Sequence, residues 1–249
     1  MTQRVDYRSD GLDDEGLPDQ PFELLTRWIE QARAAGVGGF ESPEGLAMSL
    51  ATVDPGGAPN VRTVLVRFLD ARGPGFVTDT TSTKAREIDA EARVAGSIGW
   101  PALFRVVRLR GVIEALDPGP LAAYFTARPW GSRIAALASH QSAPTGSRAD
   151  LDALFASYAA RHPDTGSPDD VPVPASWGGY RVRPWEVEFW AGRESRLHDR
   201  IVYQIDEPGG PDQDGPTPGG PAHGGPRHTD LAQWPLLDEP GWRRFRRMP

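Results

Sequence analysis

The sequence predicts a small antiparallel β-barrel with flanking helices, mainly β and of the α+β class. Short segments of strand character, joined by hairpin-like links, fill the middle of the chain. Segments with helical periodicity precede and follow them. The 249 residues suffice for one large domain or two small ones with a sizeable core.

The N-terminal part of the chain should form an arm and then a helix. Residues 1–20 are acidic and rich in turn formers, so we expect an arm with little structure of its own. From Phe22 to Ala32, apolar residues recur at helical spacing, and Gly36 follows as a stop.

The strands of the barrel come next. Asp54–Gly57 is expected to be a turn, and Ser82 should cap a helix that runs to Ala90. The expected strands are Leu46–Val53, Val61–Leu69, Gly75–Thr78, Arg93–Trp100 and Phe104–Leu116.

Two helices should follow the barrel, over Leu121–Ala127 and over Arg148–Arg161, with a Pro-Trp-Gly turn just before Ser132. Ser147 is the expected cap of the second helix. Its apolar face is expected to consist of Leu151, Leu154, Phe155 and Tyr158.

The C-terminal part should add two strands. Tyr180–Trp190 contains Pro184, which lacks a backbone donor, so this strand should be bulged or lie at an edge. Ile201–Ile205 is its expected neighbour. Asp206–Pro226 is rich in Gly and Pro without periodicity, and we expect it to be disordered. The basic run Trp242–Pro249 closes the chain, either as a solvated end or docked through its Trp.

Composition excludes several classes of function. The chain has no cysteine, which excludes disulfides, thiolate metal sites and cysteine nucleophiles, and its five histidines lack metal-ligand spacing. The net charge of −7 argues against a general nucleic-acid binder. No apolar run approaches the roughly 18 residues of a membrane helix, and the polar, acidic N-terminus is unlike a secretory signal. We therefore expect a cytoplasmic protein.

Two segments are candidate anion sites. Arg62 and Arg67 flank an apolar run, and planar guanidinium groups suit anions, although an ordinary strand with exposed arginines would look the same. Their five-residue spacing places them on opposite faces of a regular strand, so a shared site requires a bulge or a strand edge.

The hydroxyl-rich loop from Thr78 leads to Ser82 and Lys84 at a helix start, which suits an anion or is a plain helix cap. Lys84 is the chain's one lysine among 27 basic residues.

Three further constellations lie C-terminal to these. Tyr124 and Arg128 share a helix face before Ser132, which suits a phosphate clamp or a solvated helix end. His140-Gln-Ser142 is a polar cluster that composition alone does not interpret. The most specific pattern is Trp177-Gly-Gly-Tyr-Arg, then Glu-Phe-Trp190, then Arg196-Leu-His-Asp-Arg200. It suits a planar ligand with anionic ends, or a charged hairpin around a core Trp.

These motifs, taken in order, resemble pyridoxamine 5′-phosphate oxidase over nearly the whole chain. Trp177-Gly-Gly-Tyr-Arg through Arg200 is similar to the family's C-terminal signature, and Tyr124-Phe-x-x-Arg-Pro-x-x-Ser132 with Gln141-Ser142 to its central motif. Arg62-x-Val-Leu-x-Arg67 and Ser82-x-Lys84 resemble its flavin motifs. Arg4-x-x-Tyr7 resembles its N-terminal lid over the substrate.

The resemblance implies an FMN-binding split β-barrel that forms a homodimer, with FMN between the subunits. It implies an arm at residues 1–20, a barrel domain at 21–170 and a dimerisation segment at 171–249. The implied FMN contacts are Arg62, Arg67, Thr78, Lys84, Gln141, Ser142, Trp190 and Arg200. The implied substrate contacts are Arg4, Tyr7, Arg67, Tyr124, Arg128, Ser132, Arg196 and His198, of which Arg196 and His198 act beside the reacting carbon.

The activity implied by the resemblance is oxidation of pyridoxamine or pyridoxine 5′-phosphate to pyridoxal 5′-phosphate, with O₂ as acceptor and H₂O₂ as product. The flavin would take a hydride while the protein places the substrate. Two alternatives stay open: a dihydrophenazine-oxidising relative of secondary metabolism, and a flavin- or pyridoxal-phosphate-binding protein without turnover. Retention of Tyr124, Arg128 and Ser132 favours a phosphorylated substrate.

The sequence departs from the family pattern at four positions. Arg67 stands where Lys is usual, Val77 where Tyr is common, Thr83 where an Arg helps to hold the FMN phosphate, and Val106 where a Gln reaches the flavin. A lost charged hydrogen bond costs roughly 1.5–3 kcal/mol, so weaker FMN binding is expected unless Arg86 or Arg105 compensates.

Overall fold

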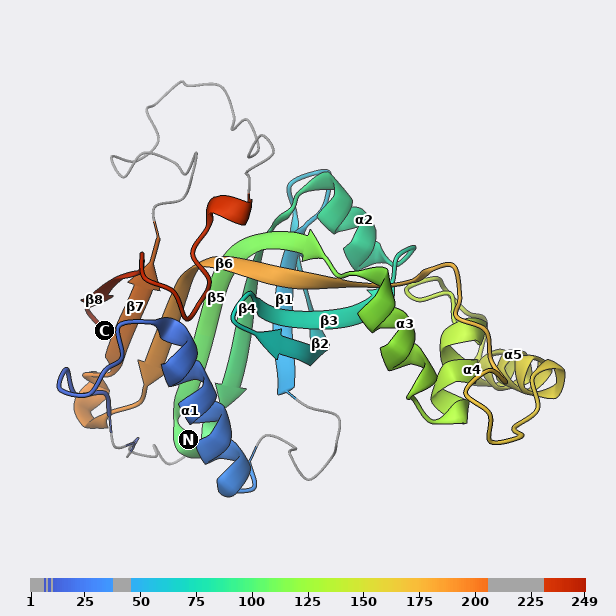
Figure 1. Cartoon of the computed structure of the whole chain (residues 1–249), viewed down its shortest axis with the longest axis horizontal. Coiled ribbons are helices and arrows are strands. Elements are labelled where there is room, and N and C mark those ends of the chain that lie inside the picture. The colour runs from blue at the N-terminus through green and yellow to red at the C-terminus, as the bar shows by residue number, and fades with distance from the viewer. Residues whose placement is uncertain (1–6, 8, 10, 38–45, 206–230) are drawn as a thin grey trace.

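A computed structural model describes residues 7, 9, 11–37, 46–205 and 231–249 (Figure 1). Arg4 and the segment 206–226 lie outside the described residues. The strands are β1 (Leu46–Val53), β2 (Pro59–Asp70), β3 (Gly73–Asp79), β4 (Arg93–Trp100), β5 (Arg105–Ala115), β6 (Trp177–Ala191), β7 (Asp199–Gln204) and β8 (Arg243–Arg246). The helices are α1 (Pro21–Ala34), α2 (Thr83–Ala90), α3 (Pro118–Thr126), α4 (Trp130–Ala138) and α5 (Arg148–Arg161). Short 3₁₀ turns lie at Pro101–Leu103, Glu194–Arg196 and Leu231–Gln233.

Six strands close into the predicted antiparallel barrel. The sheet has the order β3-β2-β1-β4-β5-β6-β7-β8, and β3 also pairs with β6. This additional pairing joins β1 to β6 in a ring, while β7 and β8 extend the sheet beyond the barrel. The fold class expected from the sequence is therefore confirmed.

Strand β6 takes part in both the barrel and the extension. Residues 177–181 pair with β3, residues 186–191 pair with β7, and β5 runs along its other side. The β5–β6 register shifts between Arg110 and Gly111, opposite Pro184. The predicted bulge is thus confirmed, and the alternative of an edge strand is wrong, because β6 has neighbours on both sides.

The predicted strand boundaries agree well with the structure. β1 and β4 begin and end where hydrophobic alternation predicts. β2, β3 and β6 extend the expected ranges by one to three residues at each end, whereas β5 is shorter than expected by one residue at each end. The turn after β1 forms around Asp54, whose Oδ1 accepts hydrogen bonds from the backbone N–H groups of Gly56 (2.9 Å) and Ala58 (2.8 Å).

Helix α1 packs an apolar face against the sheet, as its periodicity predicts (Figure 1). The Trp28 ring meets Trp100 and Phe189 edge-on, with ring centroids 6.4 and 5.2 Å apart. The three rings belong to the main core, to which the inner residues of β1, β2 and β4 also contribute.

The helices between β5 and β6 form a separate cluster around Phe125, Ile134 and Val171. A helix, α4, begins at Trp130 where the sequence predicts a turn, since Pro129 occupies the position before its first turn. The Ser147 cap of α5 is confirmed: its side chain accepts from the Asp150 N–H at 3.1 Å.

Two local expectations are wrong. Leu151 and Leu154 of α5 are exposed, because the cluster around Phe125 takes in only Phe155 and Tyr158 from the predicted apolar face. Ser82 stands before α2 without capping it. Its hydroxyl lies instead 3.4 Å from that of Thr78.

The β6 bulge makes a testable demand on Gly111. A Cβ at this position would lie 2.3 Å from the backbone oxygen of Arg183, and strand pairing leaves that atom no room to move. Gly111→Ala should lower the free energy of unfolding in urea by about 2 kcal/mol or more. Gly119→Ala, in α3 with open space around it, is the matched control and should be neutral or stabilising. Equal stability of the two variants would contradict the tight closure at the bulge.

Candidate active site

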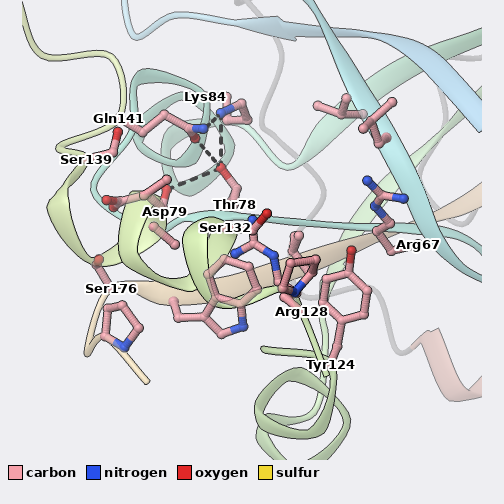
Figure 2. Close-up of a pocket in the computed structure, with 18 of the residues that line it drawn as sticks. Arg67, Thr78, Asp79, Lys84, Tyr124, Arg128, Ser132, Ser139, Gln141 and Ser176 are labelled. Atoms are coloured by element: carbon pink, nitrogen blue, oxygen red, sulfur yellow. Dashed lines mark hydrogen bonds between the residues drawn. The ribbon is translucent and has the colours of Figure 1, made fainter. Parts of the chain in front are cut away.

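A cavity of about 620 Å³ opens beside the barrel, between the β2–β3 side and helices α3 and α4 (Figure 2). Its size is within the range of small-molecule and cofactor sites. Its polar and charged lining residues are Thr63, Arg67, Thr78, Asp79, Lys84, Tyr124, Arg128, Ser132, Ser139, Gln141 and Ser176.

Strand β2 supplies one wall through its alternation. Thr63, Leu65 and Arg67 line the cavity, whereas Val66 is buried in the core and Val64, also a core residue, contributes to the lining as well. The β2–β3 register shifts between Val66 and Phe68, so Arg67 sits at a bulge. Arg67 is thus on the cavity side, as a ligand contact requires.

One side of the cavity holds a compact cluster around the only lysine (Figure 2). Lys84 Nζ donates to Gln141 Oε1 (2.6 Å) and to the Thr78 hydroxyl (3.0 Å). Thr78 also donates to Gln141 Oε1, at 2.7 Å. Both neighbours donate to the amide oxygen, so the amide NH₂ of Gln141 has the outer position and can donate to a ligand. Burial, followed by the nearby Arg62 charge, lowers the pKa of Lys84.

A second cluster stands across the cavity from Lys84 (Figure 2). The Arg128 guanidinium lies over the Trp177 ring, 4.9 Å from its centroid. The Tyr124 ring stacks on the same indole, with an angle of 10° between the two ring planes. Arg128 Nη1 is buried and makes no hydrogen bond. Burial, and then the charge of Arg67, lowers the pKa of Arg128. An anion beside Arg128 would satisfy the unpaired donor and relieve both effects.

Positive charge prevails in the lining. Arg67, Lys84 and Arg128 face a single carboxylate, Asp79. Burial opposes ionisation of Asp79, but hydrogen bonds from the Thr81 hydroxyl and N–H outweigh it and lower its pKa. The cavity therefore suits a ligand that carries more than one negative charge, with cationic groups on two sides.

Arg62 does not line this cavity. It faces the other side of β2, where its Nη2 donates to Glu87 of α2 at 2.6 Å. Glu87 also accepts from Thr52 (2.5 Å) and Asn60 (2.8 Å). Burial raises the pKa of Glu87, yet these hydrogen bonds and Arg62 lower it overall. The structure thus separates Arg62 and Arg67, as their spacing on a regular strand predicts.

The remaining residues that the sequence links to the flavin do not line the cavity. Ser142 is exposed and outside the lining, with φ of 73°. Arg86 donates to Thr83 Oγ1 (3.2 Å) on the exposed side of α2. Arg105 lies over the Trp28 ring, far from the cavity in the fold, and Val106 pairs with Trp190.

A distal cluster of predicted site residues gathers at the far end of β6. The Tyr7 ring contacts those of Trp190 and His198, with centroids 6.1 and 5.5 Å apart. His198 Nδ1 accepts the backbone N–H of Arg193 at 3.0 Å, so in the neutral ring Nε2 carries the proton. Arg196 follows in a left-handed turn, with φ of 65°.

Arg200, on β7, is held by a buried carboxylate. Its Nε and Nη2 donate to Glu188 at 2.9 to 3.1 Å, and its Nη1 donates to the backbone oxygen of Met248. Arg108 and Arg247 donate to the same carboxylate. These hydrogen bonds lower the pKa of Glu188 although burial raises it.

The cavity and the distal cluster are widely separated within one chain. Trp177 lines the cavity and Trp190 belongs to the distal cluster, a rise of roughly 40 Å along β6 at about 3.3 Å per residue. One small ligand cannot touch both. The implied contacts therefore divide into Arg67, Thr78, Lys84, Tyr124, Arg128, Ser132 and Gln141 at the cavity, and Tyr7, Trp190, Arg196, His198 and Arg200 at the distal end.

Some structural contributors have no assigned role in the sequence analysis. The Trp177 ring contacts both the Tyr124 ring and the Arg128 guanidinium. The only sequence signal for this role is that Trp177 begins the dense motif Trp177-Gly-Gly-Tyr-Arg. Asp79 directly follows Thr78 in the hydroxyl-rich loop. Asp199 lies inside the quoted motif but without a predicted partner.

Two classes of site are not found in the described part of the chain. It holds no group of three or more His, Cys, Asp or Glu side chains placed to bind a metal ion. None of its helices is both long and apolar enough to cross a membrane.

Fold and cavity together define a split-barrel protein with a cationic cavity for an anionic ligand. Residues 43–158 match the family model described as pyridoxamine 5′-phosphate oxidase. Residues 177–249 match the model of the pyridoxine 5′-phosphate oxidase C-terminal dimerisation region.

Individual proteins agree with these matches. The pyridoxine/pyridoxamine 5′-phosphate oxidase of Kineococcus radiotolerans is 45% identical over 200 residues, covering 80% of this chain and 87% of the relative. That of Rubrobacter xylanophilus is 43% identical over 206 residues, covering 83% and 91%. The crystal structure of PhzG from Burkholderia lata, in complex with tetrahydrophenazine-1-carboxylic acid, has a TM-score of 0.74 at 26% identity and covers 97% of this chain and 99% of that one.

The chain belongs to the pyridoxamine 5′-phosphate oxidase family, a family of oxidoreductases.

Proposed function

We propose that the chain is an FMN-dependent oxidase that converts pyridoxamine or pyridoxine 5′-phosphate to pyridoxal 5′-phosphate. O₂ is the electron acceptor and H₂O₂ the product; the amine substrate also consumes water and releases ammonia. The observation that carries the proposal is that Arg128, whose Nη1 is buried and unpaired, lines a cavity whose other side presents Lys84. Two cationic groups across one cavity suit two phosphates, one on the cofactor and one on the substrate.

Flavin mononucleotide supplies the hydride acceptor when bound. Lys84, Thr78 and the Gln141 amide would hold it on one side of the cavity, where the donors already converge. Arg67, Tyr124, Arg128 and Ser132 would hold the substrate phosphate on the other side. Between these two groups of residues, the chain has to place the reacting carbon of the substrate and exclude water.

We further propose that the active unit is a homodimer whose sites each combine two chains. The separation of roughly 40 Å along β6 leaves each cluster incomplete alone. A partner's distal end placed over the cavity would add Trp190, Arg196 and His198 to one site. The family model matched by residues 177–249 is that of a dimerisation region, which supports this arrangement.

Oxidation of a dihydrophenazine is the second candidate function. The similarity to PhzG, solved with tetrahydrophenazine-1-carboxylic acid, favours it. The triad Tyr124, Arg128 and Ser132 favours a phosphate ester instead, because a planar carboxylate needs fewer donors than a phosphate dianion. Anaerobic mixing with pyridoxamine phosphate, pyridoxine phosphate and a dihydrophenazine carboxylate separates the two: flavin bleaching by the phosphate esters supports the main proposal.

The cofactor proposal predicts selectivity for the flavin phosphate. Apoprotein should bind FMN at least about tenfold more tightly than riboflavin, because a charge-assisted hydrogen bond from Lys84 contributes roughly 1.5–3 kcal/mol. Fluorescence titration measures this. The Lys84→Gln variant should lose most of the preference, and since Thr83 and Val106 replace family donors, some FMN should dissociate on dilution. Equal affinity for FMN and riboflavin in the parent chain would refute the cofactor assignment.

The substrate clamp predicts a different kinetic effect. Arg128→Ala removes a charge-assisted contact to the substrate phosphate, so kcat/KM should fall about ten- to hundredfold. The fall should lie mostly in KM, and FMN affinity should change little. Arg161→Ala, at an exposed arginine of α5, is the matched control, while His198→Ala should mainly lower kcat. Release of FMN by Arg128→Ala with an unchanged KM would reverse the assignment of the two anion sites.

A further inference from the structure

Three segments that are distant in sequence meet at one buried carboxylate, that of Asp199 at the start of β7. Its Oδ2 accepts hydrogen bonds from the Leu12 N–H at 2.9 Å and from Arg193 Nε at 2.5 Å. Its Oδ1 accepts a hydrogen bond from Nη1 of Arg246, on β8, at 2.5 Å. The N-terminal arm, the loop after β6 and the C-terminal strand are therefore joined through one residue that is 8% exposed.

The arm is fastened on both sides of that contact. Arg246 Nη2 donates to the Leu12 oxygen and to Asp14 Oδ1, each at 2.7 Å. Arg193 Nη2 donates to Asp13 Oδ1 at 2.9 Å. Asp13 and Asp14 are exposed, and exposed ion pairs contribute little. The buried hydrogen bond of Leu12 to Asp199 and the partly buried one from Arg246 to Leu12 therefore carry the attachment.

Tyr7 and Ser9 of the arm lie over the distal cluster. The Ser9 hydroxyl and N–H both donate to the Gly192 oxygen, at 2.7 and 3.3 Å. Two residues earlier, the Tyr7 ring packs between Phe104, Trp190 and His198. Gly11 lies so close to the Arg193 guanidinium that a Cβ there would be 2.1 Å from Nη2. The backbone of the arm therefore passes against the Arg193 side chain, with no space there for a side chain at Gly11.

The same arginine connects Asp199 to His198. The Arg193 side chain is held by Asp199, and its backbone N–H donates to His198 Nδ1 at 3.0 Å. Burial raises the pKa of Asp199, but hydrogen bonds from Arg193 and Leu12 and the charges of Arg193 and Arg246 lower it overall, so the carboxylate is ionised at neutral pH. A charged acceptor that is buried and fully hydrogen-bonded orders its donors strongly.

We propose that Asp199 is a positioning residue: it fastens the N-terminal arm across the distal cluster and, through Arg193, sets the orientation of His198. Arg246 completes the arrangement from the C-terminal strand. Asp199 touches neither substrate nor flavin, and its effect on turnover is exerted through Tyr7 and His198. The functional part of the inference rests on the oxidase activity proposed above.

The test combines amide exchange with kinetics on the FMN-loaded enzyme. Asp199→Asn keeps the size of the side chain and an acceptor for Leu12 but removes the charge. Hydrogen exchange of residues 9–14 should accelerate about tenfold or more, while exchange in β1 and β4 stays unchanged. KM for pyridoxamine phosphate should rise roughly tenfold with a smaller fall in kcat. A merely structural residue would lower the fraction of active enzyme without raising KM.

Variants of β8 supply the matched comparison. Arg246→Gln should reproduce the faster exchange and higher KM, and Arg246→Lys should restore part of both. Arg243→Gln, on the same strand but bonded to Gln204 rather than to the arm, should match the parent.

If Asp199→Asn and Arg246→Gln leave exchange of residues 9–14 at the parental rate, the fastening is refuted. If exchange accelerates but KM does not rise, the positioning role is refuted. A parent chain that oxidises no phosphate ester overturns the proposed function instead, and the exchange result still decides the fastening.

Discussion

The pairing of β6 with three other strands is the constraint on which the rest of the structure depends. Its first part closes the barrel against β3, its last part carries β7, and β5 spans both. The bulge at Pro184 lies between the part of β6 that pairs with β3 and the part that pairs with β7. Because an extended strand cannot fold back, the same connection that closes the barrel also keeps Trp177 and Trp190 apart. A site that needs both ends of β6 must therefore take them from two chains.

Buried charge is used differently at the two ends. At the distal end each buried carboxylate is surrounded by arginines, as for Glu188 and Asp199, and these ion pairs hold segments together. At the cavity the cations prevail, and Arg128 keeps an unpaired buried donor. Buried donors without a partner also occur at Arg133, Arg181 and Trp234, but among these residues only Arg128 lines the cavity. Its unpaired donor is therefore the one that a ligand in the cavity could complete.

Much of the fold follows from local patterns in the sequence. Alternation over Leu46–Val53 and Arg93–Trp100 gives the strand limits, because one face of each strand is buried and the other is not. Helix α4 is missed since Pro129 and Gly131 suggest a turn, although Ile134 and Ala138 have helical spacing. The exposure of Leu151 depends on how far a neighbouring cluster extends, which no local pattern records.

The site is less accessible to sequence reasoning because its partners are distant. The spacing of Arg62 and Arg67 correctly separates their faces, yet the choice of Glu87 as the partner of Arg62 depends on how α2 packs. The motif from Trp177 to Arg200 suggests one compact cluster, whereas a strand extends it over two ends. The role proposed for Asp199 requires Leu12 and Arg246 to meet at its carboxylate, which only the tertiary fold specifies.

The central claim, that each site combines the cavity of one chain with the distal end of another, is tested most directly by subunit complementation. Arg128→Ala and Arg196→Ala chains, each nearly inactive at low substrate concentration, are unfolded, mixed in equal amounts and refolded together. Random pairing makes half of the dimers mixed, each with one intact site of two, so the account predicts about a quarter of the parental activity. Activity no higher than the mean of the two separately refolded variants would contradict it and place each complete site within a single chain.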